Sequence, residues 1–112
     1  MPSERTSQQY VIALTTLPAD GNAEQLAQQL VEEKLAACVS ILPPMRSVYR
    51  WKDGIERADE RQLLIKTTAE RLTDLEARLR QLHPYDIPEF VVLPIIQGSA
   101  PYLSWLSDST RK

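Results

Sequence analysis

The stretch that decides the fold is Leu82-His83-Pro84-Tyr85-Asp86-Ile87-Pro88-Glu89-Phe90-Val91-Val92-Leu93-Pro94-Ile95. It holds the only histidine of the chain and three of its eight prolines. Because proline fixes φ and biases the preceding residue towards extended geometry, we expect residues 83–89 to form a stiff, non-helical linker. The strand that follows, residues 90–93, is apolar at every position, which indicates a strand covered on both faces.

Size and charge are those of one soluble globular domain. The 112 residues are 43% hydrophobic and 25% charged. The net charge of −2 argues against nucleic-acid binding, which normally needs a surplus of lysine and arginine. No segment approaches the ~20 apolar residues of a membrane span. Residues 1–9 lack the apolar core of a signal peptide, and a single cysteine fits a reducing compartment. We expect a flexible tail over residues 1–9, one domain over residues 10–112 and a cytoplasmic location.

The rest of the chain alternates between strand and helix patterns. Hydrophobic spacing and turn residues predict strands over residues 10–17, 36–42, 45–51, 55–67 and 90–93. Amphipathic helices are expected from an Asn22 cap to Leu35 and from a Thr68 cap to Leu82, and a short terminal helix over residues 100–106, with residues 107–112 frayed. The turn Lys52-Asp53-Gly54 predicts a long hairpin whose tip extends beyond the core, and we interpret the charges from Glu56 to Arg61 as a solvated part of that hairpin with intersubunit ion pairs.

This order is the split βαβ pattern of an α+β, ferredoxin-like fold: an antiparallel sheet with both helices on one face. The first and last strands are apolar on both faces, but the two helices cover only one face of the sheet. A second copy of the chain is the simplest cover for the other face. We therefore expect a homo-oligomer joined through sheet faces and the long hairpin.

Five short motifs, in order along the chain, together point to a known family. They are Ala36-Ala37-Cys38-Val39, Val48-Tyr49-Arg50-Trp51, Leu64-Ile65-Lys66-Thr67, His83-Pro84-Tyr85 with Pro88-Glu89, and Tyr102-Leu103-Ser104-Trp105-Leu106. With them the chain resembles, over roughly residues 10 to 108, the CutA family of divalent-cation tolerance proteins. The resemblance implies a ferredoxin-like homotrimer with intersubunit strand pairing, similarity to the PII signalling proteins, a cytoplasmic location and tolerance to copper and other divalent metals.

His83 is the first candidate metal ligand, because a neutral imidazole binds copper and zinc well. Asp86 and Glu89 follow it at three-residue intervals and are weaker candidates for oxygen ligands. The alternative, which the sequence alone favours, is an imidazole that contacts the last carbonyls of the preceding helix. This chain has Thr15 and Leu82 where some family members carry a cysteine and a second histidine.

The remaining candidates are a thiol, a lysine and several aromatic side chains. Cys38 is either a soft metal ligand or redox thiol, or, as we favour, a small buried side chain. Lys66 ends an apolar strand and is expected either to form an ion pair with Glu89 or a hairpin carboxylate, or to line an intersubunit ligand cleft with Trp51, Tyr85 and Glu89. The aromatic side chains are more readily explained by packing at a trimer interface than by stacking on bases.

Three functions follow from these residues. The first is a trimeric protein, not an enzyme, that binds copper, another divalent metal or a small ligand at clefts between subunits. The second is an enzyme that uses Lys66, His83 and Glu89, although the chain has no nucleophile–base set and only three glycines. The third is a structural or signalling trimer, PII-like, that binds protein partners.

Overall fold

The computed structural model describes residues 9–112, so the predicted tail lies outside the described residues except at its last position. The elements, in chain order, are β1 (Tyr10–Pro18), α2 (Ala23–Glu32), β2 (Cys38–Ile41), β3 (Met45–Trp51), β4 (Gly54–Thr68), a 3₁₀ turn (Ala69–Arg71), α3 (Leu72–Leu82), β5 (Val91–Pro94) and α4 (Ala100–Thr110).

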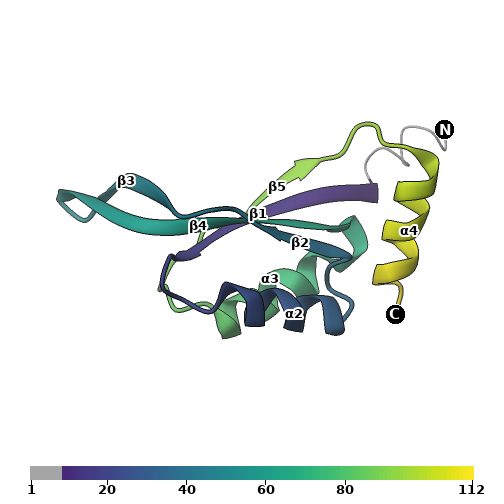
Figure 1. The fold of residues 1–112 in the computed structure, drawn as a ribbon, viewed down its shortest axis with the longest axis horizontal. Coiled ribbons are helices and arrows are strands. Elements are labelled where there is room, and N and C mark those ends of the chain that lie inside the picture. Colours follow the sequence, from purple (N-terminus) through teal and green to yellow (C-terminus); the bar gives the residue numbers. More distant parts are fainter. Residues whose placement is uncertain (1–8) are drawn as a thin grey trace.

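The strands form one antiparallel sheet in the order β2-β4-β1-β5, and β3 pairs with the far half of β4. Helices α2 and α3 lie side by side against one face of this sheet, and the β3–β4 hairpin extends beyond both of them (Figure 1). The predicted α+β, ferredoxin-like architecture is therefore confirmed, including the long hairpin.

The core lies between the sheet and these two helices. Side chains alternate between the faces of a strand, and Ala13, Leu63 and Ile65 point towards the helices, where they are fully buried. Leu30 of α2 and Leu75 of α3 meet them from the other side and are also fully buried. The spacing of the apolar residues in both helices thus serves this core, as the sequence predicted.

The helix ends differ in part from the prediction. The Asn22 side chain accepts a hydrogen bond from the Gln25 amide, at 3.1 Å, which confirms the predicted N-cap. Helix α2 ends at Glu32 rather than Leu35, because Lys34 takes a positive φ of 60° and the amide of Leu35 donates to the Leu30 carbonyl. This closes the helix one turn early.

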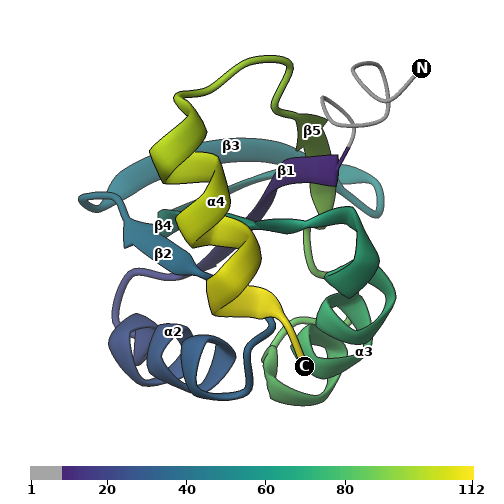
Figure 2. The ribbon, with the colours of Figure 1, turned by 90° about the vertical axis from the view of Figure 1, so that its right-hand side faces the viewer.

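The predicted cap of the second helix and the predicted frayed end were wrong. Thr68 makes no capping hydrogen bond, since a 3₁₀ turn separates it from α3. Helix α4 continues to Thr110, because Leu106 and Thr110 are buried against the end of the sheet, and the Ser107 hydroxyl donates to the Tyr10 hydroxyl at 3.0 Å. Figure 2 shows α4 crossing that end of the molecule.

The second face of the sheet is not covered within one chain. We refer to Ile12, Leu14, Leu64, Val91 and Leu93 as the open face. Val92 packs into the core, but Val91 and Leu93 are each 46% exposed. Within one chain the last strand is therefore covered on one face only, as expected from the position of the two helices (Figure 1), and its cover by a second copy stays a prediction.

Candidate functional site

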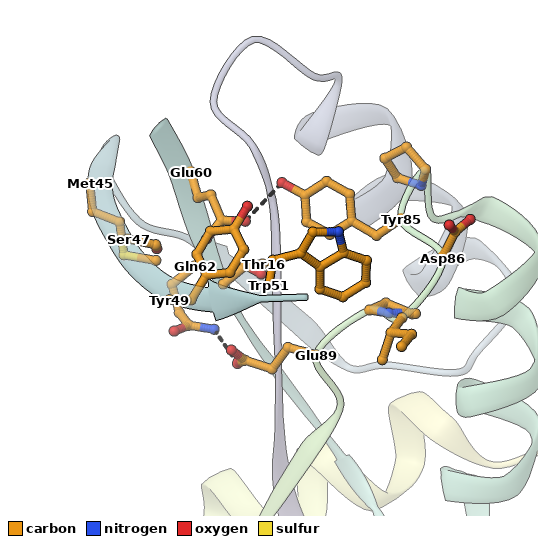
Figure 3. A pocket seen from close by; sticks show the side chains of 13 residues that line it. Thr16, Met45, Ser47, Tyr49, Trp51, Glu60, Gln62, Tyr85, Asp86 and Glu89 are labelled. Carbon is orange, nitrogen blue, oxygen red and sulfur yellow. Dashed lines mark hydrogen bonds between the residues drawn. The ribbon is translucent and has the colours of Figure 1, made fainter. Parts of the chain in front are cut away.

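A cleft of about 720 Å³ lies between the β3–β4 hairpin and the linker that follows α3. We call it the hairpin cleft. Figure 3 shows its side chains. Its lining comes from Thr16 of β1, from Met45, Ser47, Tyr49 and Trp51 of β3, from Glu60 and Gln62 of β4, and from residues 84–89 of the linker.

Strand alternation explains why these side chains meet. Every second residue of β3 points into the cleft, from Met45 to Trp51. Met45 pairs with Glu60, so the same face of β4 contributes Glu60 and Gln62. The linker supplies the opposite wall, where Pro84 and Pro88 restrict its backbone.

His83 holds the linker against β1. Its side chain is 8% exposed. Nε2 lies 2.6 Å from the Thr16 carbonyl oxygen, and the Tyr85 amide donates to Nδ1 at 3.1 Å. A carbonyl only accepts and an amide only donates, so the ring is neutral with its proton on Nε2. Burial lowers the pKa of His83 below its usual 6.5, although the hydrogen bond to Thr16 and the charge of Glu60 act in the opposite direction.

These contacts correct the favoured interpretation of His83. The imidazole does contact a backbone carbonyl, but that carbonyl belongs to β1 and not to the preceding helix. They also bear on the metal hypothesis, because both ring nitrogens are already engaged within the chain. A metal ion would have to displace one of these hydrogen bonds in order to reach the ring.

Tyr85 joins the linker to the hairpin. Its hydroxyl donates to a Glu60 carboxylate oxygen at 2.8 Å, and its ring centre lies 4.9 Å from that of His83. Burial, followed by the hydrogen bond to Glu60 and the negative charge of that carboxylate, raises the pKa of Tyr85 well above its usual 10. The hydroxyl therefore stays protonated and keeps donating to Glu60 at neutral pH.

Gln62 joins Glu89 to the sheet. Its amide nitrogen donates to the Thr15 carbonyl at 2.8 Å and to a Glu89 carboxylate oxygen at 3.0 Å. Glu89 is thereby held at the cleft wall, half-buried, whereas Asp86 lines the cleft as an exposed side chain. Figure 3 shows the Tyr85–Glu60 and Gln62–Glu89 hydrogen bonds in the cleft.

Lys66 does not join the predicted cleft within the single chain. Trp51, Tyr85 and Glu89 line it, but Lys66 lies further along β4, where its ammonium donates to the Ser40 hydroxyl at 3.2 Å. The register of β2 and β4 places Lys66 opposite Cys38. Cys38 is half-buried, so the interpretation as a fully buried side chain was too strong.

The side chains of one described chain do not fit a copper site. No group of three or more histidine, cysteine, aspartate or glutamate side chains is placed to hold a metal ion within residues 9–112. Both ring nitrogens of His83 form hydrogen bonds within the chain. Cys38 lies opposite Lys66 in the register of β2 and β4, on a different part of the sheet. These donors therefore do not identify a particular metal.

Sequence reasoning missed Glu60, Gln62 and Tyr49 as residues of the site. Glu60 was assigned to a solvated hairpin because its neighbours are charged. The pairing of Met45 with Glu60 puts it on the cleft face instead. The alternation of side chains along β3 does place Tyr49 and Trp51 on one face of the hairpin. It gives no information about where the linker lies.

Known proteins match this chain along most of its length. The family model of the CutA1 divalent ion tolerance protein matches residues 11–109. The divalent-cation tolerance protein CutA of Pectobacterium atrosepticum is 44% identical over 109 residues, which cover 97% of this chain and 99% of that protein.

Solved structures agree with these sequence matches. CutA1 from Oryza sativa superimposes with a TM-score of 0.89 and 38% identity, covering 96% of this chain and 98% of its own. A CutA from Archaeoglobus fulgidus, described as a periplasmic divalent cation tolerance protein, gives 0.87 and 31% identity, covering 91% and 99%. This antiparallel, ferredoxin-like fold is thus shared by a class of divalent-cation tolerance proteins.

This chain belongs to the CutA1 family of divalent ion tolerance proteins, as the five sequence motifs indicated. None of the described helices is both long and apolar enough to cross a membrane.

Proposed function

We propose that this protein contributes to divalent-cation tolerance as a homotrimer that binds a cationic ligand in the hairpin cleft. One observation carries the proposal. The described lining of the cleft contains three carboxylates, from Glu60, Asp86 and Glu89, and neither lysine nor arginine. Carboxylates that share a concave, partly dry site attract cations and repel anions.

The open face supports the homotrimer. Val91 and Leu93 are long apolar side chains that a single chain leaves almost half exposed, next to the partly exposed Ile12, Leu14 and Leu64. A contiguous apolar surface of this kind on a sheet is typical of a subunit interface. The hairpin extends beyond the helices and offers a second surface for a neighbouring copy (Figure 1). We propose that each cleft of this assembly lies next to a neighbouring subunit, in line with the intersubunit cleft that the sequence leads us to expect.

Copper or another divalent cation is the ligand that the description of the family suggests. Glu89 and Asp86 are the oxygen donors that one chain offers to it in the cleft. The donor set of one chain is incomplete, as described above, so any tight metal site would need groups from elsewhere.

Binding, rather than catalysis, is the activity that we propose. Lys66 makes its hydrogen bond outside the cleft, so the set of Lys66, His83 and Glu89 is not assembled in the described chain. We further propose a cytoplasmic location, which the single cysteine supports, and place a protein partner second to the cationic ligand.

Light scattering and calorimetry test these proposals together. The purified, reduced protein is expected to have the mass of three chains and to bind CuCl₂ or ZnCl₂ saturably. Glu89→Gln is expected to weaken that binding about tenfold, because it removes one charge from the cleft. Glu24→Gln is the matched control, since Glu24 is exposed in the first turn of α2, and it should change nothing. Equal binding by all three proteins would place the metal elsewhere, and a monomeric mass would contradict the trimer.

A further inference from the structure

We infer that the hairpin cleft takes an organic ammonium cation, a substituted nitrogen with an alkyl body, in preference to a bare metal ion. This inference rests on the proposed function, because it assumes that the cleft binds a cation, and it names the chemistry of that cation. Three features of the cleft carry it: its aromatic rings, one buried carboxylate and its size.

The aromatic rings come from both walls. Tyr49 and Trp51 of β3 are 42% and 40% exposed, so neither ring is closed off by the rest of the chain. Tyr85 contributes a third ring from the linker to the same cleft (Figure 3). Aromatic faces attract organic cations, and tryptophan and tyrosine are the two strongest receptors for them. A hydrated metal ion gains little from such a wall.

The buried carboxylate is Glu60. Its residue is 7% exposed, yet it makes no ion pair with any basic group of residues 9–112. Its hydrogen bond from the Tyr85 hydroxyl comes from a neutral donor. Removing a carboxylate from water is costly unless a cation compensates it, so buried carboxylates are normally paired. Here the cation is not supplied by the described chain, and the cleft is the side from which a ligand reaches it.

Tyr85 fixes the carboxylate for this purpose. Its hydroxyl occupies one oxygen of Glu60, and the ring is itself held by His83, 4.9 Å away. The Gln62 amide likewise donates to one carboxylate oxygen of Glu89. The two carboxylates are thus oriented before a ligand arrives, which reduces the entropy that binding would cost.

The size of the cleft fits a small molecule. About 720 Å³ lies within the range of roughly 300–1,000 Å³ that is usual for ligand pockets. A metal ion needs a compact set of donors instead, and residues 9–112 contain no such set of three or more. The same ammonium chemistry comes from two sources: a free small molecule, or a lysine side chain of a peptide.

The decisive probe is a matched pair of ligands. Choline and 3,3-dimethylbutan-1-ol have nearly the same shape, but only choline carries a charge, because a quaternary carbon replaces its nitrogen in the alcohol. We would titrate each into the assembled protein by calorimetry, in sodium phosphate, since amine buffers would compete. A third titration with acetyl-glycyl-lysyl-glycine amide represents the peptide source.

Saturable binding of choline, with at least tenfold weaker binding of the alcohol, is the expected result. Glu60→Gln and Trp51→Leu should each weaken choline binding about tenfold, whereas Trp105→Leu, on α4, should leave it unchanged. Tighter binding of the lysyl peptide than of choline would also support the inference and would identify a peptide as the source.

Three results would overturn the inference. If the alcohol binds as tightly as choline, the cleft recognises the shape of the ligand and not its charge. If ZnCl₂ or CuCl₂ binds in a manner that depends on Glu89 but neither ammonium ligand binds, the proposed cation site stands and the ammonium assignment is wrong. If no cation of either kind binds, the proposed function fails together with the inference.

Discussion

Replacing His83 by alanine tests how the linker is held in place. The imidazole donates to the Thr16 carbonyl and accepts from the Tyr85 amide, in an environment where it is 8% exposed. The alanine variant leaves both backbone groups without their partner, and each unpaired buried group costs about 1–3 kcal/mol. Because the Tyr85 amide is only partly buried, we expect a loss of about 2–4 kcal/mol in the free energy of unfolding at pH 7.5.

The same residue makes that loss depend on pH. Burial lowers the pKa of His83 in the folded protein below the 6.5 of the unfolded chain. Between these two values the unfolded state binds more protons, so stability falls as the pH is lowered. The stabilising contribution of His83 is complete above pH 6.5 and is lost as the pH falls from there towards the folded-state pKa. The slope is at most about 1.4 kcal/mol per pH unit.

Guanidinium unfolding of both proteins at pH 7.5, 6.5 and 5.5 measures these effects, at one protein concentration because an oligomer is more stable when concentrated. The difference between wild type and His83→Ala should shrink as the pH falls. Arg80→Ala is the control: Arg80 forms an exposed pair with Glu76, and its loss should cost less than about 0.5 kcal/mol at every pH. A difference that stays constant or grows on acidification would refute the neutral, doubly hydrogen-bonded imidazole.

For four further substitutions the structure determines the sign of the effect on stability or assembly. Thr15→Val should stabilise the protein by about 1 kcal/mol in thermal unfolding, because the buried Thr15 hydroxyl has no hydrogen-bond partner among residues 9–112. Thr110→Val should destabilise it, because the Thr110 hydroxyl donates to the Leu106 carbonyl at 3.0 Å. Leu93→Asp, on the open face, should convert the proposed trimer to monomers in light scattering, and an unchanged mass would exclude this face from the interface. Arg78→Ala breaks the bidentate pair with Glu33, at 2.9 Å, that links α3 to α2; it should cost about 0.5–1 kcal/mol in low salt and less in 1 M NaCl.

Most of the fold was predictable because hydrophobic spacing is local. The repeat of Leu26 and Leu30 in α2, and of Leu75 and Leu79 in α3, records directly which face of each helix is buried. The helix ends were less predictable. Lys34 adopts a left-handed conformation without being glycine, and α4 is prolonged by contacts of Leu106 with a strand almost one hundred residues away in the chain.

The site was predicted only in part, for a related reason. Proline spacing identified the linker and with it Tyr85, Asp86 and Glu89, all of which line the cleft. The residues that face the linker depend on how far the hairpin extends, and no local sequence pattern gives that distance. For this reason Glu60 was read as a surface charge, and Lys66 was placed in a cleft that it does not line within one chain.

The most direct test of the hairpin cleft uses the two tryptophans of the chain. Trp51 lines the cleft, whereas Trp105 lies on α4 and packs against Tyr102 at 5.4 Å. In a ¹⁵N-labelled sample each indole N–H gives its own NMR signal, and choline chloride and zinc chloride are added in separate titrations. We expect the Trp51 signal to shift along a saturable curve with at least one of them, while the Trp105 signal stays in place. A Trp51 signal that does not move with either cation would contradict the cleft as a cation site.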